Sequence, residues 1–251
     1  MPIAWEWQHK IDALVKPHGG RRWSETAKEA ARQALAGRDN PVVLEAGCGT
    51  EGWIARMLRE EGARMHVVGF DINPACLHNK DVDEVSVASI YEIPRESESV
   101  DLALSGYVLE HLEDPARALR ELYRVLKPGG SLVFWTPNRL NPVMMLSAVT
   151  GTWFHVMLRK LVWGPEGADN APTYYRSNTI GKIKRLAAQT GFECAYAGTF
   201  SSAYQYFRMC KPTYLAACIL NKPAALWPLN LFRLTILGVL RRPLNDHRGV
   251  L

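Results

Sequence analysis

Cysteine pairs at metal-binding spacing are absent from this sequence. The chain has five cysteines, an odd number, and no two of them stand at C-x-x-C spacing. A disulfide framework is built from an even set of cysteines, and structural zinc sites use closely spaced pairs. We therefore expect neither a disulfide framework nor a metal site, and a reducing cytoplasm as the location.

Targeting segments and long apolar runs are also missing. The first ten residues, MPIAWEWQHK, lack the basic flank and apolar run of a secretory signal. Near the C-terminus, charges at Lys211, Lys222 and Arg233 interrupt an apolar stretch. Uncharged runs of about ten residues are too short for a bilayer of about 30 Å. The sequence predicts no membrane-spanning helix.

Acidic residues are scarce only in the tail. Residues 206–251 have seven Lys or Arg and one acidic residue, Asp246, which gives this tail a net charge of +6. Because the whole chain has a net charge of +5, residues 1–205 have a net charge of −1. A protein that binds nucleic acid through its main domain would carry its positive charge on that domain. We expect no nucleic-acid partner.

The chain has 251 residues, of which 47% are hydrophobic, as is typical of a folded globular protein. Its sequence pattern is that of an α/β protein. Residues 1–40 are interpreted as a helical preamble, with Ser24 as a helix cap and Gly37 as its stop. Residues 41–205 are predicted to form the main domain, with an apolar insertion at about 139–176. Residues 206–251 are predicted to form a basic, apolar C-terminal extension.

Short apolar runs alternate with helical segments in the main domain. Asp114 and Pro115 mark the start of one helix, and Lys127 is expected in its last turn. Unbroken apolar strands alternating with helices indicate a doubly wound, parallel sheet covered on both faces. The carboxyl ends of such strands share one edge, where a ligand should bind. That edge collects the loop 47–52 and Asp71, Ser89, Ile90, Ser105, the stretch 105–111 and Asn138.

The stretch VLEAGCGTEG, residues 43–52, places three glycines at G-x-G-x-x-G spacing between a strand and a helix. Glycines let the backbone approach a ligand closely. Asp71 follows at the end of the next strand, where its carboxylate can hold both ribose hydroxyls. Together these features predict a nucleoside cofactor. Cys48 is interpreted as a small residue tolerated in this loop, without thiol chemistry.

Glu45 decides between two cofactor classes. An acid beside the first glycine would repel the pyrophosphate of a dinucleotide, which binds at a helix N-terminus. The same carboxylate suits the ammonium group of S-adenosylmethionine. The loop therefore favours a sulfonium cofactor, with an NAD(P)-dependent oxidoreductase as the alternative.

The run from VLEAGCGTEG through VVGFDINPACL and VLEHLEDPARALRELYRVLKPGGSLVFWTPN resembles class I S-adenosylmethionine-dependent methyltransferases. Within that class it is similar to the group related to ubiquinone-biosynthesis methyltransferases. The dense part of the match covers residues 41–138. The resemblance implies a Rossmann-like, mostly parallel seven-stranded sheet and an enzyme that uses S-adenosylmethionine.

The resemblance also implies site residues. Gly47 and Gly49 would line the cofactor, Asp71 would hold the ribose, and Ile72 would pack on the adenine. Ser89 stands where the family often has an acid, and Ile90 would supply backbone and apolar contact.

Methyl transfer is an in-line displacement, and a general base is needed only where the acceptor must lose a proton. His111 has a suitable intrinsic pKa and is the candidate base, with local packing as the alternative. Tyr107 either contacts the acceptor or walls the pocket. Relatives that bind a metal have Glu where Tyr107 stands, which disfavours a metal-dependent version.

Acceptor contacts are predicted at Asn138 and in a lid formed by Tyr174, Tyr175 and Arg176. The alternative is that Asn138 shapes a turn and that the 174–176 segment is an ordinary surface loop. We expect methylation, preferably at oxygen, of a small-molecule or lipid-linked acceptor. A non-catalytic cofactor-binding protein is a further alternative.

The tail leaves two interpretations open. Residues 206–242 either contact an anionic membrane peripherally, at its inner face, or complete the sheet and pack on the domain or on a second subunit of a homodimer.

Overall fold

The computed structural model describes residues 7, 10–11, 22–142, 144–145, 171–201, 210–220, 223 and 226–244. The chain divides into two compact units. The sheet unit consists of Ser24–Thr136, Thr173–Gly198 and Leu237–Leu251. The second unit consists of Met1–Trp23, Pro137–Pro172 and Thr199–Ile236. Most of the predicted insertion, residues 146–170, lies outside the described residues, so the predicted domain boundaries stay a prediction.

A seven-stranded sheet forms the centre of the described fold, with strand order β3-β2-β1-β4-β5-β7-β6. The pairs β1–β2, β1–β4, β2–β3 and β4–β5 are parallel. The prediction of a mostly parallel, Rossmann-like sheet is confirmed. The strands are β1 Val42–Ala46, β2 His66–Asp71, β3 Glu84–Val87, β4 Val100–Gly106, β5 Leu126–Pro137, β6 Glu193–Phe200 and β7 Thr235–Arg241.

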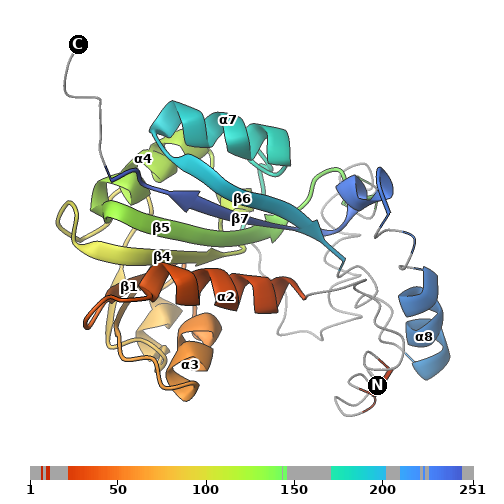
Figure 1. The fold of residues 1–251 in the computed structure, drawn as a ribbon, viewed down its shortest axis with the longest axis horizontal. Helices are drawn as coiled ribbons and strands as arrows, with labels where there is room; N and C mark the ends of the chain where they lie inside the picture. Colours follow the sequence, from red (N-terminus) through yellow and green to blue (C-terminus); the bar gives the residue numbers. More distant parts are fainter. Residues whose placement is uncertain are drawn as a thin grey trace. The chain divides into compact units, whose positions relative to one another are not determined.

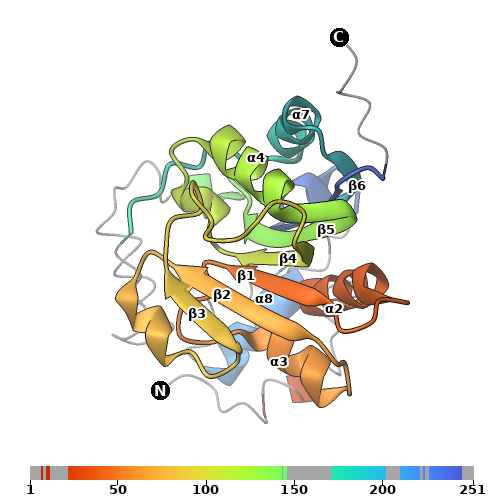
Figure 2. The ribbon, with the colours of Figure 1, turned by 90° about the vertical axis from the view of Figure 1, so that its left-hand side faces the viewer.

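Helices cover both faces of the sheet (Figures 1 and 2). Helices α2 and α3 lie on one face, and α4 and α7 lie on the other. Because both faces are covered, β1 and β4 are buried almost along their whole length. The bounds of the helices are α2 Trp23–Leu35, α3 Trp53–Glu60, α4 Pro115–Val125 and α7 Ile180–Thr190.

Helix α4 begins as the sequence predicts. The Asp114 side chain accepts a hydrogen bond from the backbone N–H of Arg117, and Pro115 occupies the first helical position. Leu119 and Leu122 lie on the buried face of the helix. These features fix α4 against the sheet, on the face that it shares with α7.

Two predicted boundaries are wrong. Helix α4 ends at Val125, and Lys127 lies in β5 because Leu126 already pairs with Val100 of β4. The residue before a proline disfavours helical geometry, which also prevents residue 127 from extending the helix. Helix α2 begins at Trp23, so Ser24 lies inside the helix rather than capping it.

The C-terminal part of the chain completes the sheet, because β7 comes from residues 235–241. This agrees with the interpretation that the tail supplies a final strand. Arg242 follows β7, is buried, and donates hydrogen bonds to the backbone oxygens of Tyr123 (3.1 Å) and Leu126 (2.7 Å). This part of the tail is thus integral to the sheet unit.

The second unit has its own small core. Helix α8, Lys211–Leu220, buries Tyr214 and Cys218, against which Ile11 and Ala217 pack. The short helix η6 covers Leu229–Phe232. Among the described residues, no helix combines the length and the apolar character needed to cross a membrane.

Candidate functional site

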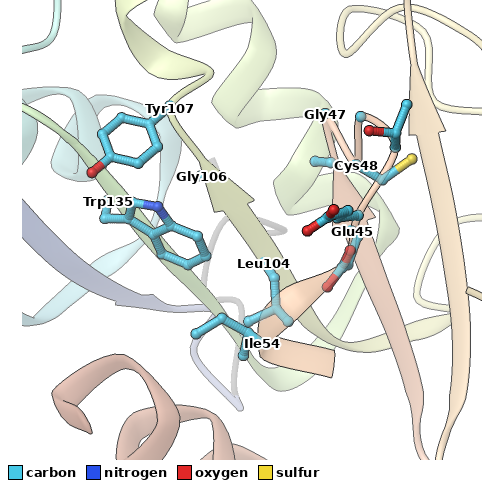
Figure 3. Close-up of a pocket in the computed structure, with 12 residues that line it drawn as sticks. Glu45, Gly47, Cys48, Ile54, Leu104, Gly106, Tyr107 and Trp135 are labelled. Carbon is cyan, nitrogen blue, oxygen red and sulfur yellow. The ribbon is translucent and has the colours of Figure 1, made fainter. Parts of the chain in front are cut away.

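A cavity of about 300 Å³ lies at the carboxyl ends of β1, β4 and β5. Figure 3 shows Glu45 and Cys48 on one side of it and Tyr107 and Trp135 on the other. The edge predicted to bind a ligand therefore has a cavity of the size that ligand sites have. Its lining residues are Glu45, Ala46, Gly47, Cys48, Gly49, Thr50, Glu51, Ile54, Leu104, Gly106, Tyr107 and Trp135.

The glycine loop follows β1 with a left-handed turn. Gly47 has a φ of 74°, a conformation that is costly for residues with a Cβ. A Cβ at Gly47 would also come within 2.3 Å of the Val108 side chain. The backbone N–H groups of Gly47 and Cys48 both donate to the Phe70 oxygen, at 2.9 and 3.0 Å. These bonds tie the start of the loop to the end of β2.

Side chains from the end of β2 and from the segment after it hold the rest of the loop. Asp71 Oδ2 accepts from the Gly49 N–H at 3.0 Å. Asn79 Nδ2 donates to the Cys48 oxygen at 3.0 Å and more weakly to the Gly49 oxygen at 3.3 Å. The backbone N–H groups of residues 47, 48 and 49 are thus all used within the protein.

The third glycine of the pattern, Gly52, leaves space for the Glu45 side chain. A Cβ at Gly52 would lie 2.3 Å from Glu45 Oε2, so any larger residue would meet the carboxylate. The Gly52 N–H donates to Asp81 Oδ2 at 2.9 Å, and the Ala55 N–H, in the first turn of α3, reaches Glu45 Oε1 at 3.4 Å. The carboxylate therefore lies under the start of α3.

Burial raises the pKa of Glu45 to about 7, although the hydrogen bond from the Ala55 N–H acts in the opposite direction. The Glu45 carboxylate is buried and accepts a weak hydrogen bond from the Ala55 N–H, so it gains from a cation that approaches it. Glu45 thus fits an ammonium group in the cavity and opposes a phosphate there.

Asp71 has one oxygen on Gly49 and the other, Oδ1, on the Asn73 N–H at 2.8 Å. Each carboxylate oxygen can accept more than one hydrogen bond, so ribose hydroxyls remain compatible with these contacts. The neighbouring Ile72 side chain is 71% exposed, as expected for an apolar surface that a flat ring could cover. The roles predicted for both residues stay predictions.

Ser89, Ile90 and Ser105 are not among the cavity-lining residues. Ser89 Oγ accepts from the Tyr91 N–H at 3.2 Å, and Ile90 is buried. Ser105 is buried on β4 between the cavity-lining Leu104 and Gly106. Their cofactor contacts stay predictions.

Cys48 lines the cavity as part of the loop, and burial raises the pKa of its thiol to about 12. A thiol with this pKa is not ionised at neutral pH and is a poor nucleophile. The structure thus supports the interpretation that Cys48 has no thiol chemistry.

Tyr107 lies where β4 ends, and 46% of its surface is exposed. Its φ of 57° is unusual for a residue other than glycine, and its N–H donates to the Trp135 oxygen at 2.9 Å. Such conformations concentrate at functional sites. Both rings lie on the same side of the cavity (Figure 3), which makes this the apolar side of the site.

His111 ends the short helix η2, Leu109–His111, and is half-buried. The structure does not place it among the cavity-lining residues. Its neighbour Glu110 is buried and accepts a hydrogen bond from Thr136 Oγ1 at 2.9 Å. Asn178 Nδ2 in turn donates to Thr136 Oγ1 at 2.6 Å. This buried chain of polar groups fixes the segment that carries His111.

The segment 174–176 lies against residues 110–113. The N–H groups of Tyr174 and Tyr175 donate to the Glu110 oxygen at 2.7 and 3.1 Å. The Tyr174 hydroxyl donates to Glu113 Oε1 at 2.5 Å, and Arg176 donates to the Glu113 oxygen at 2.6 Å. The structure thus brings the predicted lid next to the predicted base, without making either line the cavity.

Asn138 belongs to the second unit and is buried there. Its side-chain N–H groups donate to the oxygens of Leu231 (2.8 Å) and Arg233 (2.7 Å), and its oxygen accepts from the Leu140 N–H (3.1 Å). Both amide hydrogens are used in these contacts. The observed role of Asn138 is structural, and an acceptor contact stays a prediction.

Sequence reasoning missed several residues of the site. Asn79 and Asp81, which hold the loop, stand in the polar stretch HNKDVDE, where no spacing marks them. Trp135 lines the cavity from β5, inside a run that indicates only a buried strand. Among the described residues, no group of three His, Cys, Asp or Glu side chains could hold a metal ion.

Comparisons with known proteins agree with this geometry. Residues 44–134 match the model of the methyltransferase domain family. The chain contains a class I S-adenosylmethionine-dependent methyltransferase domain. The predictions of this family and of S-adenosylmethionine as the cofactor are confirmed.

Three relatives show how far the similarity reaches. A protein of Mycolicibacterium smegmatis, named "probable S-adenosylmethionine-dependent methyltransferase", is 33% identical over 138 residues, 53% of this chain and 51% of the relative. The ubiquinone biosynthesis O-methyltransferase of Pseudomonas entomophila is 30% identical over 165 residues, 62% of this chain and 66% of the relative. The demethylmenaquinone methyltransferase of Listeria welshimeri is 36% identical over 102 residues, 36% of this chain and 42% of the relative. The chain thus spans between two fifths and two thirds of these relatives.

Two solved structures share the fold. The S-adenosylmethionine-dependent methyltransferase of Mesorhizobium loti superposes with a TM-score of 0.53 at 20% identity, over 86% of this chain and 98% of that one. The geranyl diphosphate C-methyltransferase of Streptomyces coelicolor gives a TM-score of 0.57 at 14% identity, over 87% of this chain and 79% of that one. At these identities the likeness supports the fold alone.

Proposed function

We propose that this protein transfers a methyl group from S-adenosylmethionine to an oxygen of a small-molecule or lipid-linked acceptor. When bound, the cofactor supplies an activated methyl group on a sulfonium ion. The observation that carries the proposal is the buried Glu45 carboxylate in the cavity, next to a loop whose N–H groups at residues 47–49 are already hydrogen-bonded. A pyrophosphate needs such N–H groups and is repelled by the carboxylate.

The residues of the cavity, and Asp71, which holds the glycine loop without lining the cavity, have separate tasks in this proposal. Glu45 holds the ammonium end of the cofactor, and Asp71 holds the ribose at the opposite side of the glycine loop. Tyr107 and Trp135 exclude water from the side where the acceptor enters. Orientation of the acceptor against the methyl carbon supplies much of the rate in an in-line displacement.

His111 is the proposed general base. It takes the proton from the acceptor hydroxyl, while Glu110, Thr136 and Asn178 keep its segment in place. Oxygen as the methylated atom is supported by one relative named as an O-methyltransferase of ubiquinone biosynthesis. Other relatives are named demethylmenaquinone methyltransferases, which supports a quinone-like acceptor in general.

Calorimetric titration separates the cofactor classes. We expect S-adenosylhomocysteine to bind and NAD to give no heat. Binding of NAD without S-adenosylhomocysteine would support the oxidoreductase alternative and contradict the proposal.

Turnover with isotope-labelled cofactor and a panel of phenols, hydroxyquinones and lipid extracts tests the reaction. We expect labelled methyl ethers among the products. For the base, His111→Asn should lower kcat by about 10²–10⁴, with unchanged binding of S-adenosylhomocysteine. His78→Asn is the matched control, since His78 is an exposed histidine that does not line the cavity, and it should keep the wild-type rate. A His111→Asn variant with the wild-type rate would show that the acceptor needs no base at this position.

A further inference from the structure

The segment Leu226–Phe232 of the second unit presents large apolar side chains to solvent. Single exposed apolar residues are normal on protein surfaces, but a contiguous group of them marks an interaction site. Here five of seven consecutive residues are between 42% and 80% exposed, and Trp227 is the most exposed. The five are Leu226, Trp227, Leu229, Leu231 and Phe232.

The backbone of this segment is folded into hydrogen-bonded turns. The Leu226 N–H donates to the Pro223 oxygen at 2.9 Å, and the Asn230 N–H donates to the Leu226 oxygen at 2.8 Å. The Leu231 N–H donates to the Pro228 oxygen at 3.1 Å. The exposed side chains are therefore carried by a compact, defined structure.

Buried side chains of the same unit hold this backbone from the inside. Asn138 donates to the oxygens of Leu231 and Arg233 at 2.8 and 2.7 Å. Asn141 donates to the Phe232 oxygen at 2.7 Å. Both asparagines are buried.

Thr199 also donates a side-chain hydrogen bond to a backbone oxygen of this segment, that of residue 230. Its hydroxyl donates to the Asn230 oxygen at 2.5 Å, and the Arg233 guanidinium donates to the Thr199 oxygen at 3.1 Å. Because the carbonyl groups of residues 230–233 are used on the inside, the apolar side chains of this stretch are left on the outside. We infer that the exposure of these side chains is built into the fold.

The charged residues that flank the segment in the sequence are of one sign. Residues 206–245 contain no Asp or Glu and six Lys or Arg. Lys222 and Arg233 bracket the apolar segment in sequence. Helix α8 of the same unit begins at the exposed Lys211 and exposes Leu215 and Ile219 on one face. Apolar side chains with a tryptophan, among cations and without carboxylates, are typical of surfaces that bind anionic lipid headgroups.

We propose that Leu226–Phe232 docks on the surface of an anionic phospholipid membrane. The apolar side chains insert at the level of the headgroups, and Lys211 and Arg233, two cations of the same unit, contact lipid phosphates. A second copy of the chain is a poorer occupant, because a two-fold interface through this segment would bring together two copies of the stretch 206–245, which contains Lys and Arg but no Asp or Glu. The inference does not depend on the proposed methyl transfer.

Vesicle flotation of the full chain tests the inference. We expect the protein to float with vesicles of phosphatidylcholine and phosphatidylglycerol, and to float much less with phosphatidylcholine alone or at 1 M salt. The double variant Leu226→Ser/Trp227→Ser should lose at least about tenfold in partition, since burial of one large apolar side chain is worth about a factor of ten.

Leu77→Ser is the matched control, because Leu77 is an exposed apolar residue of the sheet unit. It should float as the wild type does. Thermal unfolding and binding of S-adenosylhomocysteine check that each variant is folded. Equal flotation of the double variant and the wild type would overturn the inference. So would a wild-type protein that stays unbound, or a dimer in solution that the double variant converts to a monomer.

Discussion

The loop of residues 47–52 and the segment of residues 226–233, which contains the short helix η6, both have a backbone that is hydrogen-bonded to side chains of their own unit. Asp71, Asn79 and Asp81 bind the loop, while Asn138, Asn141 and Thr199 bind the segment. The loop lines a cavity with a buried carboxylate, whereas the segment exposes apolar side chains. Hydrogen bonds between side chains and the backbone therefore stabilise a cavity with a buried carboxylate in one unit and an exposed apolar surface in the other.

The largest effect is expected where a Cβ would break the loop. Gly47→Ala places a methyl group against Val108 in a backbone conformation that alanine disfavours. Titration with S-adenosylhomocysteine should show binding at least about 100-fold weaker.

Gly37→Ala is the matched control, since Gly37 has a similar φ of 72° and nothing within 4 Å of the added Cβ. Gly37→Ala should lower the free energy of unfolding by the cost of the backbone conformation alone, and it should bind S-adenosylhomocysteine with wild-type affinity. If Gly47→Ala bound as tightly as Gly37→Ala, the close approach at the loop would be irrelevant to the cofactor.

The second effect concerns the charge of Glu45. Because its pKa in the folded protein is about 7, above its ordinary value, its protonated form stabilises the fold. This contribution is fully present below the unfolded pKa of about 4.5 and is lost as the pH rises through 7, a difference of about 3 kcal/mol. Glu45→Gln removes this dependence, so the ligand-free variant should be more stable than the wild type at pH 8.5.

Affinity for the cofactor should change in the opposite direction. Wild-type binding of S-adenosylhomocysteine should strengthen as the pH rises through 7, because the ammonium group needs the carboxylate, and Glu45→Gln should bind about 100-fold more weakly at pH 8.5. Denaturant unfolding and calorimetry at pH 5.5, 7 and 8.5 measure both quantities. A pH-independent affinity in the wild type would contradict the role of Glu45.

A smaller effect should follow from loosening the apolar segment. Asn138→Ala removes two hydrogen bonds to backbone oxygens, and Asn141→Ala removes one. The free energy of unfolding should fall by about 2–4 kcal/mol in the first case and about 1–2 kcal/mol in the second. Limited proteolysis should show faster cleavage within residues 226–233. Unchanged cleavage in both variants would mean that the asparagines do not hold the segment.

The smallest effect is expected from the cysteines. Cys210 is exposed, and its hydrogen bond with Thr213 lowers the pKa of its thiol, whereas burial raises that of Cys48. Iodoacetamide should therefore alkylate Cys210 at least about tenfold faster, with cofactor affinity unchanged within about twofold. Mass spectrometry of peptides after timed quenching measures the two rates. Faster alkylation of Cys48 than of Cys210 would mean that Cys48 has a reactive thiol, which would contradict its interpretation as a residue without thiol chemistry.

Much of the cofactor side was predictable because its signals are local. Strand, glycine loop and helix follow one another within about twenty residues, and Asp71 closes the next strand. Topology then brings the ends of parallel strands together, so Glu45 and Asp71 could be placed at one edge without further information. The cap at Asp114 was equally local.

The surroundings of the residues proposed for the acceptor were less predictable because their contacts are long-range. Asn178 reaches Thr136, and Tyr174 reaches Glu110, across many residues of chain without any periodic pattern. Asn138 was placed at the strand edge correctly, but its amide is used on backbone oxygens more than ninety residues away. No local rule states which carbonyl groups a side-chain amide will meet.

The amino-acid sequence by itself thus determined the succession of strands and helices along the chain, the glycine loop, and the position of Glu45 and Asp71 at one edge of the sheet, since short-range periodicity and parallel topology suffice for these. Only the tertiary structure decided which side chains hold the loop 47–52 and the segment 226–233, and that residues 226–232 turn their apolar side chains outward. A backbone oxygen carries no sequence signature, so its partner is chosen only when distant parts of the chain have packed.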